Sequence, residues 1–210
     1  MAHWLAPVIS YLLGAIPFGL IIGLSRGIDI RKLGSGNIGA SNVLRTLGTG
    51  PAVAVFFFDT VKGLAAVIIA HAFGLNPYLV VACGLMSIFG HTFSVFLGFK
   101  GGKGVATSLG VIIGLNPVIA GIAFVIWSIL VAVTRYISLA SIVATIWVAL
   151  AMVFWKSMGV PIPYQALACV AALAIILKHT SNMKRLINGT EAKIGQKVDL
   201  RDSVRGEEPE

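Results

Sequence analysis

The sequence predicts an all-α polytopic membrane protein with seven transmembrane helical segments, two of them short. Of its 210 residues, 57% are hydrophobic and only 11% are charged, and the mean hydropathy is +0.93. That composition is too apolar for an ordinary water-soluble domain. Apolar runs recur at about the 20-residue length that crosses about 30 Å of hydrocarbon. The number of crossings follows from these runs and from the positions of lysine and arginine.

Residues 105–133 are too long for one helix and are interrupted by Gly114, Asn116 and Pro117. They form either one kinked span or two short ones. The other apolar runs qualify, or nearly qualify, as single spans. These runs are 3–24, 51–73, 78–97, 138–155 and 162–178.

The basic residues decide between one kinked span and two. Connectors at 74–77 and near Gly159 carry no lysine or arginine except Lys156, so both are expected outside. Lys103 and Arg135 can both be inside only if the chain between them turns back at Asn116-Pro117. We therefore expect the N-terminus outside and the C-terminus in the cytoplasm. The residues assigned inside are Arg26, Arg31, Lys32, Arg45, Lys100, Lys103, Arg135, Lys178, Lys184 and Arg185.

We expect one transmembrane domain, residues 1–185, followed by a polar cytoplasmic tail, residues 186–210, that ends in disorder. The first apolar run lacks the features of a cleaved signal peptide. The net charge of +8 sets topology and does not indicate nucleic acid. Cys83 and Cys169 lie in apolar runs without ligand spacing, so neither a disulfide framework nor a zinc site is predicted. No metal and no cofactor are expected.

The first loop has the composition of a phosphate-binding segment. Residues 34–42 read GSGNIGASN and precede Arg45, and the amides of such small residues can turn toward an anion. The alternative is a simple turn, because Gly, Ser and Asn are common in turns. The candidate ligands are Ser35, Gly36, Asn37 and Arg45.

A second glycine-rich segment, residues 98–104, reads GFKGGKG and precedes a helix. Free amides, the positive helix end and a lysine together favour an oxyanion. The spacing is not that of a Walker P-loop, since three residues separate Gly98 from Gly102 and no Ser or Thr follows the lysine. The alternative is a flexible turn whose lysines only set topology. The candidates here are Lys103 and the amides of Gly101, Gly102 and Gly104.

Asp59 and Lys62 lie three residues apart within an apolar run, on one face of the expected helix. Unpaired charges there are costly, so an ion pair is expected, either at a functional site or as a structural link between helices.

Polar residues near the expected inner helix ends are further candidates. His91 and His179 could face one cytoplasmic cavity, and Asn182 and Arg185 follow His179 at helical spacing. Ser141, near Arg135, is either a packing residue or a ligand.

Taken together, these motifs resemble the PlsY family of bacterial acyl-phosphate glycerol-3-phosphate acyltransferases. The resemblance covers nearly the whole chain and includes Arg135 with Ser141 and His179 with Asn182 and Arg185. Ser41 stands where the family commonly has Thr, which keeps the hydroxyl. The segments that carry the resemblance are 34–42, 59–63 and 90–107.

The resemblance implies a seven-helix fold in the bacterial inner membrane with the active site facing the cytoplasm. It implies transfer of a fatty acyl group from acyl phosphate to the 1-hydroxyl of glycerol 3-phosphate, giving lysophosphatidate and inorganic phosphate. That reaction is the first step of bacterial phospholipid synthesis. The expected partners are these two substrates and membrane lipid, with no nucleic acid; the oligomeric state is not predicted.

The roles that we assign follow the two glycine-rich loops. Ser35, Asn37 and Arg45 would hold one phosphate, with Gly36 and Ser141 as further binding residues. Lys103 and the second-loop amides would hold the other phosphate or neutralise the leaving group. His179 and Asn182 would orient the glycerol hydroxyl.

Acyl phosphate is already activated, so covalent catalysis is not required. No histidine here is followed five positions later by the aspartate that many glycerolipid acyltransferases use. The base is then His179, a substrate phosphate oxygen, or none; we favour the phosphate. Ser35 has no adjacent base and is assigned to binding, not to nucleophilic attack.

Two other classes remain as alternatives. A carrier of a phosphorylated metabolite also uses broken helices around a basic site, but no inverted repeat is found. A lipid-phosphate phosphatase would need a nucleophile or a metal cluster, and the acidic residues are few and dispersed.

Overall fold

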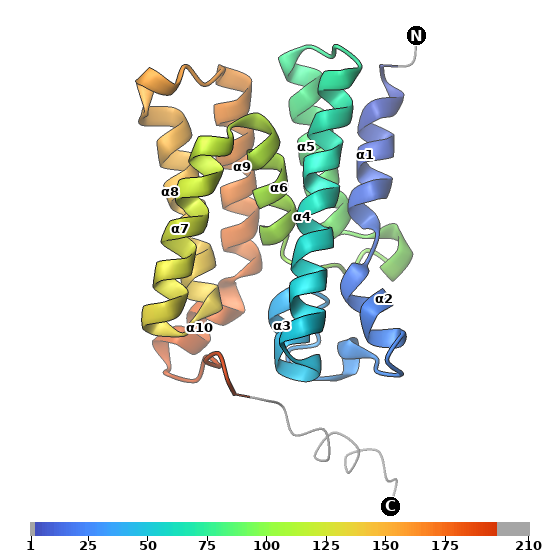
Figure 1. The fold of residues 1–210 in the computed structure, drawn as a ribbon, viewed down its shortest axis with the longest axis vertical. Helices are drawn as coiled ribbons and strands as arrows, with labels where there is room; N and C mark the ends of the chain where they lie inside the picture. The colour runs from blue at the N-terminus through green and yellow to red at the C-terminus, as the bar shows by residue number, and fades with distance from the viewer. Residues whose placement is uncertain (1–2, 197–210) are drawn as a thin grey trace, which may run out of the picture.

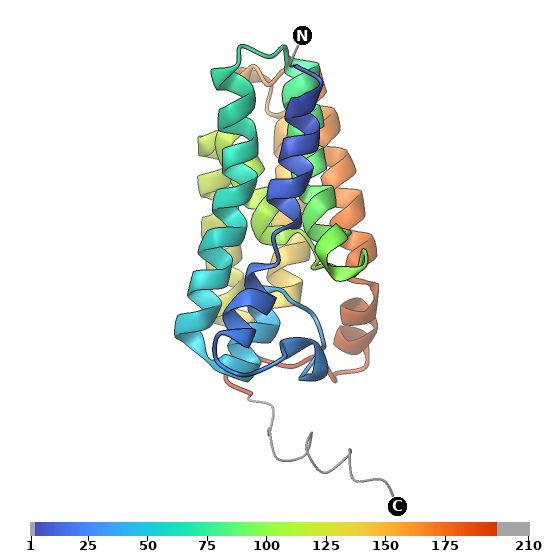
Figure 2. The same ribbon diagram turned by 90° about the vertical axis from the view of Figure 1, so that its right-hand side faces the viewer.

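Apolar helices that run side by side form the body of the protein (Figures 1 and 2). The structure is a computed structural model that describes residues 3–196. Its α-helices are α1 (Leu5–Ala15), α2 (Phe18–Leu24), α3 (Ala40–Leu47), α4 (Thr49–Ala72), α5 (Pro77–Thr92), α6 (Val105–Leu115), α7 (Pro117–Thr134), α8 (Ile137–Phe154), α9 (Ile162–Lys178) and α10 (Thr180–Ile187). Three short 3-10 helices are η1 (Ile30–Lys32), η2 (Val95–Leu97) and η3 (Lys156–Met158). The predicted all-α class is confirmed.

Five helical stretches among the described residues are long and apolar enough to cross a membrane: Leu5–Leu24, Thr49–Ala72, Pro77–Leu97, Pro117–Thr134 and Ile137–Phe154. A sixth is added if α9 and α10, which meet at 56°, count as one broken span. Large apolar side chains such as Phe57, Val61 and Ile68 of α4 are exposed on the outside of the bundle, as lipid contact requires. The count of seven crossings and their orientation stay predictions.

The chain does turn back at Asn116-Pro117, as expected. Asn116 caps α7 by accepting a hydrogen bond from the Ile119 amide (3.0 Å), and Pro117 supplies the first helical residue. The prediction that both resulting helices are short is wrong for the second. The helix α6 has 11 residues and α7 has 18, because no further break interrupts the apolar run before Thr134.

The first span is broken at Pro17, which has no N–H group to continue the helix. The break frees two carbonyl oxygens inside the bundle. That of Ala15 accepts a hydrogen bond from the Ser94 hydroxyl (2.6 Å), and that of Ile16 accepts one from Lys62 Nζ (2.8 Å). Polar side chains therefore satisfy backbone groups that lipid could not.

Glycines set the closest helix contacts, and the most extensive pairs are α1 with α5 and α4 with α6. A Cβ on Gly63 would overlap the carbonyl of Thr107, and one on Gly110 would overlap the carbonyl of Thr60. These two glycines let α4 and α6 approach in register, which is the usual function of small residues between membrane helices.

The two ends of the bundle differ in what they carry. At one end lie only the connections α4–α5, α6–α7 and α8–α9, together with the start of α1 (Figure 1). At the other lie α2, α3, the α7–α8 turn and α10. The segment that joins α5 to α6 lies well above that second end (Figure 2). Because α6 is short, this segment enters the bundle instead of ending at its surface.

We predict that Gly110→Ala lowers the stability of the protein in detergent. The added methyl group meets the α4 backbone and costs about 1–3 kcal/mol of overpacking. Gly121→Ala on α7 is the matched control, since no atom lies within 4 Å of its added Cβ. Thermal unfolding measures both. Equal melting temperatures for the two variants would contradict the close α4–α6 contact.

Candidate active site

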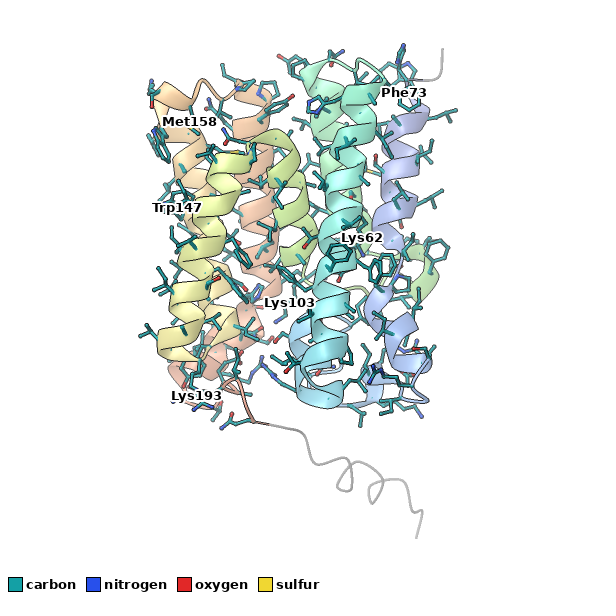
Figure 3. All side chains as sticks on the ribbon, viewed as in Figure 1. Lys62, Phe73, Lys103, Trp147, Met158 and Lys193 are labelled. Atoms are coloured by element: carbon teal, nitrogen blue, oxygen red, sulfur yellow. The ribbon has the colours of Figure 1, made fainter. Side chains whose placement is uncertain are left out.

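A cavity of about 450 Å³ brings together polar residues from distant parts of the chain. The first loop, α3, α6, α8 and the α9–α10 junction all contribute to its lining. Figure 3 shows Lys103 between the α4 side and the α7–α9 side of the bundle, above the level of Lys193. Most of the predicted site residues line it, namely Ser35, Asn37, Arg45, Asp59, Lys103, Gly104, Ser141, His179 and Asn182.

Asn42 holds the first loop in shape from inside. Its side chain is buried and donates to the carbonyl oxygens of Ile30 (3.0 Å) and Leu33 (3.1 Å). Its Oδ1 accepts a hydrogen bond from the Ser35 amide (2.9 Å). Ile30 and Ile38, on either side of the glycines, are buried in an apolar cluster with Val43. The loop is thus fixed by packing and by one asparagine.

These bonds decide which groups of the first loop remain available to a ligand. The Ser35 amide is taken by Asn42, so Ser35 offers its hydroxyl. Asn37 Oδ1 accepts from the Gly39 amide (2.9 Å), so Asn37 offers its side-chain N–H groups. Gly36 adopts a φ of 67° and does not line the cavity. Its contribution is the left-handed turn.

The second loop reaches the cavity through the side chain of Lys103 and the backbone of Gly104. The amides of Gly101 and Gly102 donate to the carbonyl oxygens of Thr92 (3.1 Å) and His91 (3.0 Å) at the end of α5. The prediction that these two amides bind phosphate is therefore wrong. Lys103 extends into the cavity and donates to Asn182 Oδ1.

Glu191 joins the catalytic candidates to one another. Its Oε1 accepts hydrogen bonds from Ser138 (2.7 Å) and Asn182 (2.7 Å), and its Oε2 lies 2.7 Å from Arg185 Nε. Arg45 lies 3.9 Å from the same carboxylate. Burial alone raises the pKa of Glu191, but the hydrogen bonds from Ser138, Asn182 and Arg185 lower it overall. Glu191 is thus a buried anion that links α8, α10 and α3.

The segment that carries Glu191 is held against the α7–α8 turn. Arg135 donates to the carbonyl of Ile194, and the Ile194 amide donates back to the carbonyl of Arg135 (2.9 Å). Arg135 thereby positions Glu191 indirectly. The expected tail, residues 186–210, begins inside α10, and its first residues form part of the site; residues 197–210 lie outside the described part of the chain.

The surroundings of Lys103 shift its pKa, and those of His179 fix its tautomer. Burial lowers the pKa of Lys103 to about 8; Glu191 opposes this shift, and the charges of Arg185 and Arg45 add to it. His179 is buried, and its Nδ1 lies 2.8 Å from the carbonyl oxygen of Ile175. A carbonyl only accepts, so Nδ1 carries the proton and Nε2 of the neutral ring is the acceptor.

The predicted ion pair of Asp59 and Lys62 is present. Lys62 Nζ lies 2.7 Å from Asp59 Oδ1, and both side chains are 3% exposed. Asp59 lines the cavity, whereas Lys62 does not. Lys62 instead supports the break in the first span through Ile16.

An apolar cavity of about 70 Å³ adjoins the polar one. Both are lined by Phe56, Phe124 and Trp127, whose rings pack together, and the Trp127 indole donates to the Ser141 hydroxyl (3.2 Å). Ala144, Ala168 and other small residues of α8 and α9 line the far side. The site therefore has a charged part beside an apolar one.

A family model described as glycerol-3-phosphate acyltransferase matches residues 4–189. The chain belongs to this family. The relationship predicted from the motifs is confirmed. The glycerol-3-phosphate acyltransferase of Thermus thermophilus is 44% identical over 92% of this chain and 96% of its own length. Glycerol-3-phosphate acyltransferase 1 of Deinococcus radiodurans is 46% identical over the same shares.

The solved structures agree with this assignment. The crystal structure of PlsY (YgiH), an integral membrane glycerol 3-phosphate acyltransferase, in its glycerol 3-phosphate form superimposes with a TM-score of 0.87 and 41% identity. The superposition covers 93% of this chain and 96% of the PlsY chain. The lysophosphatidic acid form of that protein gives a TM-score of 0.84, with coverage of 93% and 97%. The chain is accordingly an integral, multi-pass membrane protein.

We predict that Glu191→Gln destabilises the protein. The amide cannot accept from all its donors and leaves Arg185 without a counter-ion, at a cost of about 1–3 kcal/mol. Asp29→Asn is the matched control, because the Asp29–Arg31 pair (2.7 Å) is exposed and such pairs contribute little. Thermal unfolding should show a lower melting temperature for Glu191→Gln alone. A fall of the same size in both variants would contradict the buried role.

Proposed function

We propose that the protein transfers a fatty acyl group from acyl phosphate to the 1-hydroxyl of glycerol 3-phosphate. The products are lysophosphatidate and inorganic phosphate, and the reaction is the first step of bacterial phospholipid synthesis. One observation carries the proposal: a single cavity gathers two separate cationic, glycine-rich segments and adjoins an apolar chamber. Two phosphates and one alkyl chain require that combination.

The two phosphates are assigned to different elements. Ser35, Asn37 and Arg45 supply a hydroxyl, an amide and a guanidinium from the first loop and α3, which suit the phosphate of glycerol 3-phosphate. Lys103 comes from the opposite wall and suits the acyl phosphate, whose negative charge grows as it leaves. The acyl chain extends past Phe56 and Trp127 into the apolar chamber.

The chemistry needs positioning more than activation. The 1-hydroxyl oxygen attacks the acyl carbon, the carbon–oxygen bond to phosphate breaks, and the hydroxyl proton passes to a phosphate oxygen. Holding the two reactants side by side supplies most of the rate. His179 Nε2 accepts a hydrogen bond from the attacking hydroxyl and so orients it. Lys103 stabilises the charge that develops on the leaving phosphate.

We place the active site on the cytoplasmic side of the inner membrane. The segment between α2 and α3, α3 itself, the α7–α8 turn and α10 lie at one end of the bundle (Figure 1). They carry Arg26, Arg31, Lys32, Arg45, Arg135, Lys184 and Arg185. Short loops rich in lysine and arginine are retained in the cytoplasm. The cavity opens among these elements.

The direct test incubates the purified protein with palmitoyl phosphate and labelled glycerol 3-phosphate. Labelled lysophosphatidate supports the proposal. Release of phosphate without acylated product would assign the protein to the phosphatases, and binding without turnover of either kind would favour a carrier.

We predict that Lys103→Ala lowers kcat by about 10²–10³-fold, the usual effect of removing one donor to a developing charge. The melting temperature should stay unchanged, because the side chain enters a cavity and packs on little. Lys100→Ala is the matched control: it removes a lysine of the same loop that is exposed and does not line the cavity. Wild-type turnover in Lys103→Ala would refute the assigned role.

Binding of the acyl phosphate, tested with palmitoyl phosphate, should weaken as the pH rises through about 8. Lys103 is protonated below its pKa of about 8 in the empty site, and a bound phosphate dianion favours the protonated form. Above that pH binding requires proton uptake, so the dissociation constant rises by up to about tenfold per pH unit.

Isothermal titration between pH 7 and 9.5 measures this dependence. Lys103→Arg keeps the charge at every pH in the range and should bind with a nearly constant affinity. An equal pH dependence in the wild type and in Lys103→Arg would show that another group titrates.

A further inference from the structure

A buried cluster of three ionisable side chains lies in the wall of the cavity, which Asp59 and His91 line, and has no part in the mechanism above. Asp59 Oδ1 lies 2.7 Å from Lys62 Nζ and 3.5 Å from His91 Nδ1. Asp59, Lys62 and His91 are 2%, 4% and 4% exposed, so their side chains are buried within the bundle and kept away from lipid. Buried ionisable groups inside a membrane protein are costly and mark a function.

The His91 ring has contacts on both of its nitrogen-bearing sides. Its Nδ1 faces the Asp59 carboxylate. Its Nε2 side packs directly on Gly102, where a Cβ would overlap the ring. Its carbonyl accepts the Gly102 amide (3.0 Å), and the next carbonyl, of Thr92, accepts the Gly101 amide (3.1 Å). His91 also lines the cavity, but its ring lies between Asp59 and the Gly102 backbone, and we assign it to the support of that backbone.

The cluster is also tied to the broken first span. Lys62 donates to the carbonyl oxygen of Ile16 (2.8 Å), beside Pro17. Figure 3 shows Lys62 about midway along α4, and the second loop runs to Lys103 lower in the bundle. Three elements, the α1–α2 break, α4 and the end of α5, therefore meet at Asp59.

We propose that Asp59, Lys62 and His91 are positioning residues that set the place of Lys103. The imidazole of His91 forms a platform for the backbone of Gly102, one residue before Lys103. Asp59 fixes the ring by its Nδ1, and Lys62 fixes Asp59. The cluster touches no reacting atom, and it acts on the reaction only through the backbone that carries the lysine.

A different role for the cluster, simply holding helices together, makes another prediction. Loss of helix packing would lower activity whether or not Lys103 is present. Loss of positioning would matter only while Lys103 is there to be positioned. A double-mutant cycle between His91 and Lys103 separates the two.

The cycle uses His91→Asn, which retains a donor near Asp59 but removes the ring beneath Gly102. We expect His91→Asn to raise the dissociation constant of palmitoyl phosphate and to lower kcat/KM about 10–100-fold, since a shift of about 1 Å in a catalytic group costs up to about 10²-fold. In the Lys103→Ala background the same substitution should change either quantity less than about twofold.

Asp59→Asn is the second variant, because it keeps the shape of the side chain and removes its charge. Its effects on binding and on kcat/KM should likewise depend on the presence of Lys103. This variant can replace His91→Asn in the cycle if His91→Asn fails to fold. His71→Asn is the matched control: His71 is an exposed histidine at the far end of α4, next to Tyr164 (3.3 Å). It should leave binding, turnover and melting temperature at wild-type values.

Two results would overturn the proposal. One is unchanged binding and turnover in both His91→Asn and Asp59→Asn. The other is an equal loss with and without Lys103, which would make the cluster a general stabilising element. The turnover part rests on the proposed function, so dissociation constants are measured separately. A wild type that binds palmitoyl phosphate but forms no lysophosphatidate refutes the acyltransferase proposal, and the binding cycle still decides the positioning proposal.

Discussion

The site depends on one buried carboxylate that holds three cations together. Arg45, Lys103 and Arg185 come from separate elements and would repel one another if nothing lay between them. Glu191 pairs directly with Arg185 at 2.7 Å and lies 3.9 Å from Arg45. It reaches Lys103 through Asn182. Three cations and one carboxylate leave two positive charges, so the site attracts phosphate groups.

Placing such charges inside a membrane protein requires that backbone groups be satisfied wherever a helix is interrupted. The fold does this with the same residues that carry charge. Lys62 and Ser94 donate to the carbonyls freed at Pro17, and the amides of Gly101 and Gly102 donate to carbonyls at the end of α5. The short helix α6 leaves room below it, so Lys103 lies within the bundle.

Much of this could be predicted from the sequence, and the missing parts have identifiable causes. Helix positions follow from apolar runs and Asn-Pro caps, and the motif residues Ser35, Lys103 and His179 do line one cavity. Glu191 was not predicted, because a lone acid in a polar segment after α10 carries no periodicity. Its position depends on Arg135 and Ile194, a tertiary contact that no local pattern encodes.

The glycines of the second loop show why a motif can indicate the right site for a wrong reason. As sequence, Gly101 and Gly102 suggest free amides that face a phosphate. In the structure both amides are bonded to α5, and a Cβ on Gly101 or Gly102 would overlap His91. Glycine is required for close packing, at Gly101 against the backbone of His91 and Thr92 and at Gly102 against the buried His91 ring. The chemical specificity of the loop therefore lies in Lys103, and the glycines determine the position of the Lys103 backbone.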